Sequence, residues 1–165
     1  MRHRWMIACA AALLLPAAAL LLAPEARERS AGIRLAASDT AVYAWLSDPE
    51  RWSALLRIPE GTPLGPAGAD SASGIAWTEA GLPQTLTITA GVPHQFIAAE
   101  RRPFLAAGIA QELDIELEAG EDGSLQVWLT ETWLAESRWQ RLLLLLRPAP
   151  VPEARLEALR QALEG

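Results

Sequence analysis

Ser38-Asp39-Thr40-Ala41-Val42-Tyr43-Ala44-Trp45-Leu46-Ser47-Asp48-Pro49-Glu50-Arg51-Trp52 is the stretch that decides the fold, because it predicts two short helices joined by their own caps. Ser38 or Asp39 can accept hydrogen bonds from the free amides of the first helix. Asp48, followed by Pro49, can do the same for the second helix. Apolar residues recur three and four positions apart and form one stripe on each helix. These residues are Val42, Trp45 and Leu46, then Trp52, Leu55 and Leu56.

Strand-like segments lie on both sides of this helix pair. The expected strands are 33–37, a brief one at 56–58, and then 74–79, 85–90, 95–101, 109–118 and 125–133. Turn residues separate the later ones, including Gly81-Leu82-Pro83, Gly91-Val92-Pro93-His94 and the Asp122-Gly123 hairpin signal. Residues 62–73 collect Gly, Pro, Ala, Ser and Asp and are expected to form a loop. The order predicts an antiparallel sheet built mainly after the helix pair.

Two helical segments end the chain. Residues 136–146 place Trp139, Leu142, Leu143 and Leu146 at helical spacing, and the prolines that begin at Pro148 stop or kink this helix. Helical spacing resumes at residue 152, with Leu156, Leu159 and Leu163 on one face. We expect Trp139 to pack against the core and 142–146 to be a buried helix face. The alternative for 142–146 is a segment that dips into a membrane interface.

The first residues predict a membrane anchor. Residues 1–4 are basic, and 5–23 then run nineteen residues without a charge. As a helix this run is roughly 28 Å long, close to the hydrocarbon thickness of a bilayer. We therefore expect an anchor at 1–24, a charged linker at 25–30 and a domain at 31–165 on the extracytoplasmic side. A cleaved signal peptide, with 17–19 as a small-residue cleavage site and a secreted or periplasmic product, is the alternative.

Composition excludes several kinds of function. The 165 residues carry a net charge of −6, and all fourteen basic residues are Arg, so no basic cluster can match a nucleic-acid backbone. Cys9 is the single cysteine and lies in the apolar run, which leaves the domain without a disulfide or a thiolate metal site. His94 is the single histidine beyond that run. We therefore expect no metal and no cofactor.

The order of elements resembles the START-like, polyketide cyclase/dehydrase and lipid-transport superfamily (SRPBCC). The resemblance rests on 37–52, 88–96, 125–131 and 156–164, and it covers about 31–165. It implies an α+β helix-grip fold in which a curved antiparallel sheet of about six or seven strands wraps around the C-terminal helix. It also implies an apolar cavity for a hydrophobic ligand. Fold signatures of this kind leave the function open.

Alternation along the strands gives candidate cavity residues. Glu79, Glu100 and Glu131 each follow apolar residues of the same parity, and Glu131 is the candidate for a general acid or base. The alternative is that each lies at a strand end and turns to solvent. The complete set of cavity candidates is Trp77, Leu86, Ile88, Phe96, Ile109, Gln111, Leu113, Leu129 and Glu131. Trp128 has the opposite parity and is expected on the outer surface.

Three functions are compatible with these features. The first is a membrane-anchored domain that binds a hydrophobic small molecule, such as a lipid or an isoprenoid- or polyketide-like compound, without catalysis. The second is an enzyme of the cyclase, hydratase or isomerase type that uses Glu131. The third is a membrane-tethered interaction module that binds a protein partner. That module would use the loop 62–73 or the acidic outer face of 109–118.

Overall fold

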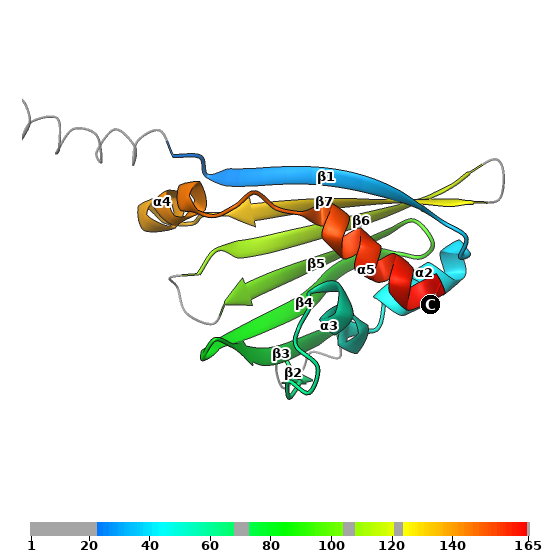
Figure 1. Cartoon of the computed structure of the whole chain (residues 1–165), viewed down its shortest axis with the longest axis horizontal. Coiled ribbons are helices and arrows are strands. Elements are labelled where there is room, and N and C mark those ends of the chain that lie inside the picture. The colour runs from blue at the N-terminus through cyan, green and yellow to red at the C-terminus, as the bar shows by residue number, and fades with distance from the viewer. Residues whose placement is uncertain (1–22, 68–72, 104–107, 121–123, 165) are drawn as a thin grey trace, which may run out of the picture.

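The computed structural model describes residues 23–67, 73–103, 108–120 and 124–164, and within them an antiparallel sheet curves around helices (Figure 1). The sheet has seven strands in the order β1-β7-β6-β5-β4-β3-β2. The elements are β1 (Ala26–Leu35), α2 (Asp39–Leu46), η1 (Pro49–Arg51), α3 (Trp52–Leu55), β2 (Gly65–Pro66), β3 (Gly74–Glu79), β4 (Leu82–Val92), β5 (Phe96–Pro103), β6 (Ala110–Ala119), β7 (Leu125–Leu134), α4 (Arg138–Leu146) and α5 (Pro152–Glu164). The expected α+β architecture, with short helices after the first strand and a helix at the end, is confirmed.

The helix pair forms as its caps predict. The Ser38 hydroxyl accepts a hydrogen bond from the Ala41 amide at 3.2 Å, and the Asp48 carboxylate accepts one from the Glu50 amide at 3.1 Å. Both apolar stripes are buried, and Trp52 is wholly enclosed while its indole donates to the Leu46 carbonyl at 2.7 Å. The pair therefore covers one half of the inner sheet face.

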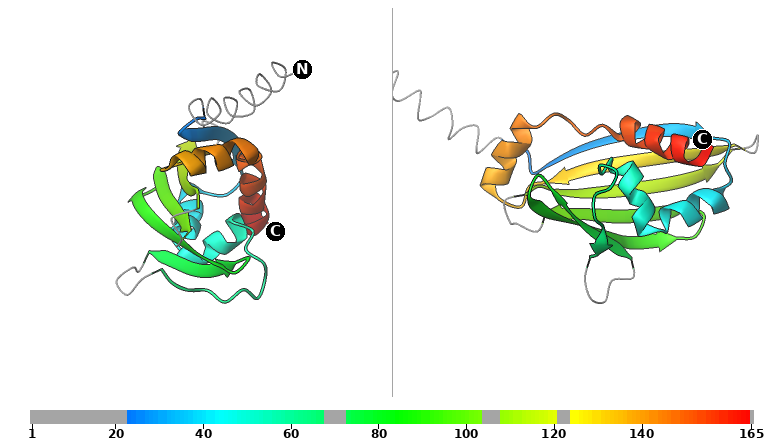
Figure 2. Two further views of the ribbon diagram at one scale, coloured as in Figure 1. Left: turned by 90° about the vertical axis from the view of Figure 1, so that its left-hand side faces the viewer. Right: turned by 60° about the horizontal axis from the view of Figure 1, so that its bottom comes forward.

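The hydrophobic core fills that half of the sheet. Helices α2, α3 and α5 lie on the concave face (Figure 2) and pack against inward side chains of six strands. The core includes Leu35, Ile75, Leu86, Ile97, Leu113, Ile115, Val127, Leu129, Leu156 and Leu159. A bulge between Ile88 and Ala90 shifts the β4–β5 register and bends β4. Buried apolar side chains therefore fill this half of the inner face among the described residues.

Strand β1 corrects the predicted linker. It begins at Ala26, and residues 26–35 pair with β7 along their whole length. The charges of Arg27 and Arg29 suggested a solvated linker, but these residues face a polar part of the inner surface, opposite Trp133 and Glu131. The brief strand expected at 56–58 is also wrong, because α3 ends there and Arg57 takes a positive φ of 55°.

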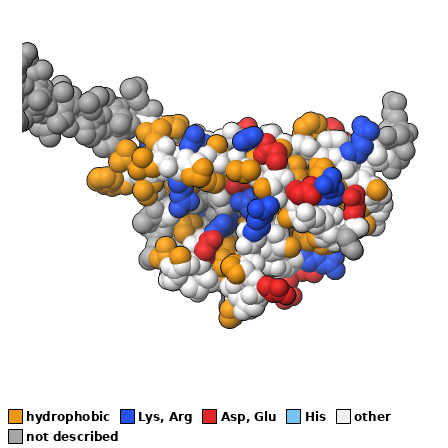
Figure 3. Space-filling model, in the orientation of Figure 1, with side chains coloured by type: hydrophobic (Ala, Val, Ile, Leu, Met, Phe, Trp, Pro, Cys, Tyr) orange, Lys and Arg blue, Asp and Glu red, His pale blue; other side chains and the backbone are white. Residues whose placement is uncertain are grey.

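Helix α4 is not packed as predicted, with Trp139 against the core and 142–146 as a buried face. Trp139 is 71% exposed, and Leu143, Leu145 and Leu146 are exposed with it, so they do not form a buried helix face. Hydrophobic side chains gather over α4 at one end of the molecule (Figure 3). The helix itself is well formed, because Ser137 and Gln140 make a reciprocal capping box. Its buried side chains are Gln140 and Leu144.

The outer face of the sheet is polar, as the alternation predicts. Glu112, Glu116 and Glu118 are exposed there, and the Trp128 indole donates to Glu118 at 3.1 Å. Trp128 also covers Gly32 on the neighbouring strand. None of the helices in the described ranges is long and apolar enough to cross a membrane. The predicted anchor (up to residue 22) and the Asp122-Gly123 turn lie outside the described residues.

Candidate functional site

The inner face of the sheet becomes polar at the end beside α4. Because the strands are antiparallel, this end collects the last residues of β3, β5 and β7 and the first residues of β4 and β6. The inward side chains there are Glu79, Gln84, Arg101, Gln111, Glu131 and Trp133. Alternation alone places them on the same side as the apolar core. The inner face of the sheet therefore has one apolar half, which packs in the core, and one polar half.

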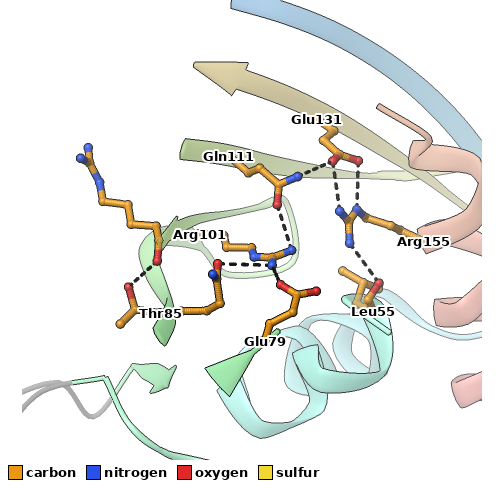
Figure 4. Close-up of polar contacts among 9 residues, drawn as sticks. Leu55, Glu79, Thr85, Arg101, Gln111, Glu131 and Arg155 are labelled. Carbon is orange, nitrogen blue, oxygen red and sulfur yellow. Dashed lines mark hydrogen bonds and ion pairs between the residues drawn. The ribbon is translucent and has the colours of Figure 1, made fainter. Parts of the chain in front are cut away.

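Glu131 is the centre of the buried part of this polar half (Figure 4). It is 1% exposed and forms a two-pronged ion pair with Arg155 of α5, with Nε–Oε2 at 2.9 Å and Nη2–Oε1 at 3.0 Å. The Gln111 amide and the Trp133 indole also donate to Oε1, at 3.1 and 2.6 Å. Arg155 donates further to the Leu55 carbonyl at 3.3 Å. Every oxygen of Glu131 is thus engaged, and the cluster ties β7 to α5 and α3.

Arg101 is the centre of the neighbouring group. Its guanidinium forms an ion pair with Glu79 and donates to the side-chain oxygens of Gln84 and Gln111, both at 3.3 Å. It also lies over the Trp77 ring, 5.2 Å from the centroid. Gln111 therefore connects the two groups, since its oxygen accepts from Arg101 while its nitrogen donates to Glu131.

A cavity of about 510 Å³ lies against these groups and opens to solvent. Its lining combines charged and amide side chains with apolar ones. The lining residues are Glu79, Ala80, Leu82, Gln84, Arg101, Pro103, Gly108, Ile109, Gln111, Trp133, Arg147 and Arg155. The volume is within the range of small-molecule sites, which is about 300–1,000 Å³. The cavity is amphipathic, whereas the resemblance implied an apolar one.

Arg147 differs from the other two cavity arginines. Its guanidinium lies 5.9 Å from the centroid of the Trp133 ring, and no carboxylate among the described residues pairs with it. Arg101 is neutralised by Glu79 and Arg155 by Glu131. The three arginines and the two carboxylates together carry a net charge of +1. Arg147 is the arginine without a carboxylate partner among the described residues.

The surroundings also act on Arg101. Burial lowers the pKa of its guanidinium, and the positive charges of Arg155 and Arg147 lower it further, while Glu79 opposes both effects. The guanidinium of an arginine stays protonated in proteins, so Arg101 remains charged at neutral pH. The cavity wall is thus positive, and its arginines differ in access to water: Arg101 and Arg155 are largely buried, whereas Arg147 is exposed.

The predicted cavity residues divide into four groups. Ile109 and Gln111 line the cavity, while Trp77 and Glu131 lie behind it in contact with Arg101 and Arg155. Three leucines and one isoleucine belong to the solid core or pack against it: Leu86, Leu113, Leu129 and Ile88. Phe96 corrects our assignment, because its cross-strand neighbour is Glu116 on the outer face. Glu100 shares that face, where it forms an ion pair with Arg102.

Sequence reasoning missed the three arginines that define the site. Arg101, Arg147 and Arg155 lie on β5, after α4 and on α5, and no spacing rule connects them. A weak signal was available in Arg101, which follows Ile97 and Ala99 with the parity of the core. A charged residue at the end of an inward-facing row indicates either a strand end or a polar site.

Comparison with known proteins supports the fold and assigns neither a family nor a function. No protein-family model matches the sequence, and no curated protein matches it either. Solved structures with similar folds include protein CV1439 from Chromobacterium violaceum (TM-score 0.54, 16% identity, 84% of this chain and 99% of that one). XoxI from Bacillus cereus gives a TM-score of 0.56 at 12% identity over 84% and 96% of the two chains.

A further similar structure is the Aha1 dimer from Colwellia psychrerythraea, with a TM-score of 0.51 and 17% identity over 83% of this chain and 96% of that one. The chain thus shares the helix-grip fold of Aha1 and SRPBCC-like proteins, as its resemblance implied. At these identities the likeness establishes the architecture alone.

Proposed function

We propose that this chain is a membrane-anchored binding domain for a small molecule that has an apolar body and one anionic group, and that it binds this molecule without catalysis. Arg147 carries the proposal, because its guanidinium is a cation on the cavity wall that no described carboxylate neutralises. Arginine presents a planar set of donors that matches a carboxylate or a phosphate. A ligand that brings one negative charge would balance the site.

The rest of the lining supports an amphipathic ligand. Leu82, Ile109 and the Trp133 ring provide apolar contact, and Gln84 offers an amide beside Arg101. A wholly apolar molecule would leave these polar groups without their water, which costs free energy. The hydrophobic ligand expected from the sequence is therefore refined to an acidic one, of which a fatty acid is the simplest example. Anchoring through 1–24, with the domain on the extracytoplasmic side, would give the site access to such molecules.

The arrangement around Glu131 does not favour the enzymatic alternative. A general base needs a free lone pair directed at the substrate. Both oxygens of Glu131 already accept hydrogen bonds, and the residue is not part of the cavity lining. Its geometry suits a charge partner that holds Arg155 at the cavity wall.

Calorimetric titration with octanoate and with 1-octanol tests the proposal on the full chain. Octanoate should bind more tightly than the alcohol, which has the same chain length and no charge. Arg147→Gln should weaken octanoate binding roughly 10- to 150-fold, the equivalent of about 1.5–3 kcal/mol for a hydrogen bond to a charged group.

The same variant should leave the affinity for octanol nearly unchanged. Arg160→Gln is the matched control, since it removes an exposed arginine whose partner is Glu157 on the same helix. Equal affinity of the wild type for octanoate and octanol would refute the anionic site. An equal loss of octanoate affinity in Arg147→Gln and Arg160→Gln would also refute it.

A further inference from the structure

Helix α4 presents its apolar residues to solvent, which is the reverse of a helix packed against a core. Trp139 and Leu146 are 71% and 77% exposed, and Leu143 and Leu145 are each 44% exposed. The side directed at the domain holds Leu144 together with Gln140, whose amide donates to the Gly108 carbonyl at 2.5 Å. One side of the helix is therefore packed against the domain, and its other side is apolar and exposed.

Three of these exposed residues form one stripe along α4. Trp139, Leu143 and Leu146 are at positions i, i+4 and i+7, which lie above one another on a helix. Val151, five residues after the end of α4, is also exposed, at 51%. A contiguous apolar patch of this kind marks a surface that is covered in function, whereas single exposed leucines need no explanation.

The charges around the stripe indicate what covers it. Within α4 the charged side chains are Arg138 and Arg141, of which Arg141 forms an ion pair with Glu25, and Arg147 follows directly. A helix with Trp and Leu on one side and arginines beside them is typical of a segment that lies in a bilayer interface. Anionic lipid headgroups attract such arginines, and tryptophan favours the same depth.

The position of α4 indicates the same occupant. The Ala135 amide donates to the Glu25 carbonyl at 2.8 Å, and the Arg27 guanidinium donates to the Leu144 and Arg147 carbonyls at 3.0 and 2.9 Å. Residues 25–27 are therefore attached to α4. The nineteen uncharged residues 5–23 end just before this attachment, and their number matches the thickness of a bilayer.

We infer that the outer face of α4, defined by Trp139, Leu143, Leu145 and Leu146, docks on the surface of a lipid bilayer. Arg147 follows the last residue of this helix and also lines the cavity. Docking would therefore bring the positive wall of the cavity to the headgroup region. An acidic amphipath could then pass between membrane and cavity with its charged group beside Arg147. The docking face rests on its own observations and does not depend on the ligand.

Site-specific fluorescence on the full chain tests this inference. With Cys9→Ser as background, Leu146→Cys is labelled with a nitrobenzoxadiazole dye, and Val92→Cys is the control. Val92 is also exposed and apolar, but it ends β4, next to Gly91, which lies close to Tyr43 of α2. Both proteins are reconstituted into vesicles of phosphatidylcholine and phosphatidylglycerol, with and without nitroxide-labelled lipid.

The inference predicts that the dye at 146 shifts to shorter wavelength and that nitroxide lipid quenches about half of its emission or more, while the dye at 92 does neither. Equal behaviour at both positions overturns it, as does a chain that does not associate with the vesicles. A dye at 146 that is shielded from aqueous iodide but untouched by nitroxide lipid also overturns it. In that case protein covers the face, either a second copy or the segment 5–23.

Discussion

Replacing Glu131 with glutamine tests whether this buried carboxylate is structural. The substitution keeps the shape of the side chain but removes the charge that pairs with Arg155. Glu131 is 1% exposed and the Arg155 side chain 14%, so the ion pair is largely shielded from water. Removing one member of a buried ion pair costs about 3–5 kcal/mol. Glutamine retains one oxygen acceptor for Trp133 or Gln111, so we expect a value near the lower end, about 3 kcal/mol.

Urea unfolding followed by circular dichroism measures this loss. With a slope of about 2 kcal/mol per molar urea for a domain of this size, Glu131→Gln should lower the midpoint by about 1.5 M. Glu157→Gln is the matched control, because it removes a half-exposed carboxylate from the ion pair with Arg160 and should cost at most about 1 kcal/mol. Equal midpoints for the two variants would refute the structural role.

A double variant separates charge from packing. Adding Arg155→Met to Glu131→Gln removes the arginine that has lost its carboxylate partner. The double variant should therefore regain much of the stability that the Glu131→Gln variant lost. If the double variant is as unstable as the sum of the single ones, Arg155 is not the reason for the loss.

Two further substitutions probe the outer face of the sheet. Gly32→Ala places a Cβ 2.6 Å from the Trp128 ring and should cost about 1–3 kcal/mol in urea unfolding, whereas Gly65→Ala meets no atom within 4 Å; equal midpoints would contradict this packing. Burial and, after it, the neighbouring acidic groups raise the pKa of Asp114 in the folded protein. Its contribution to the free energy of unfolding is therefore complete below about pH 4, and it is lost as the pH rises through the pKa of the folded state. Asp114→Asn should therefore be more stable than the wild type at pH 7 and equal to it at pH 3, and a constant difference across this range would contradict the argument.

Local signals in the sequence predicted the helix pair and most of the strands. Ser38 and Asp48 act as caps, and the alternation from Ala110 to Ala119 separates inner from outer residues correctly. These features depend on residues close together in the chain, which is why they could be seen without a structure. The same reasoning predicted that Trp128 lies on the outer surface.

Predictions failed where the local pattern was ambiguous. In β5 both parities are weakly apolar, and pairing with β6 places Phe96 outside and Ile97 inside. In α4 leucines occur on every side, so periodicity could not show that Leu144 is buried while Leu146 is exposed. Charges at the start of β1 indicated a linker, because its polar inner neighbours were unknown.

The site itself depends on tertiary contacts. Glu131 points inward, one of the two orientations that the sequence left open, and its partner Arg155 is 24 positions away on a helix. Arg147 directly follows α4, and its guanidinium reaches the cavity beside the Trp133 ring. No single segment contains two of the cavity arginines, so a sequence pattern could suggest an apolar hollow but could not show its charge.

Mass spectrometry of the small molecules that the full chain retains through purification tests the central claim most directly. The chain is denatured and its bound molecules are extracted, with Arg147→Gln and Arg160→Gln treated in the same way. The account predicts acidic amphipaths bound to the wild type and to Arg160→Gln, and their depletion from Arg147→Gln. Neutral lipids alone, the same acids in all three proteins, or no bound molecule in any of them would contradict it.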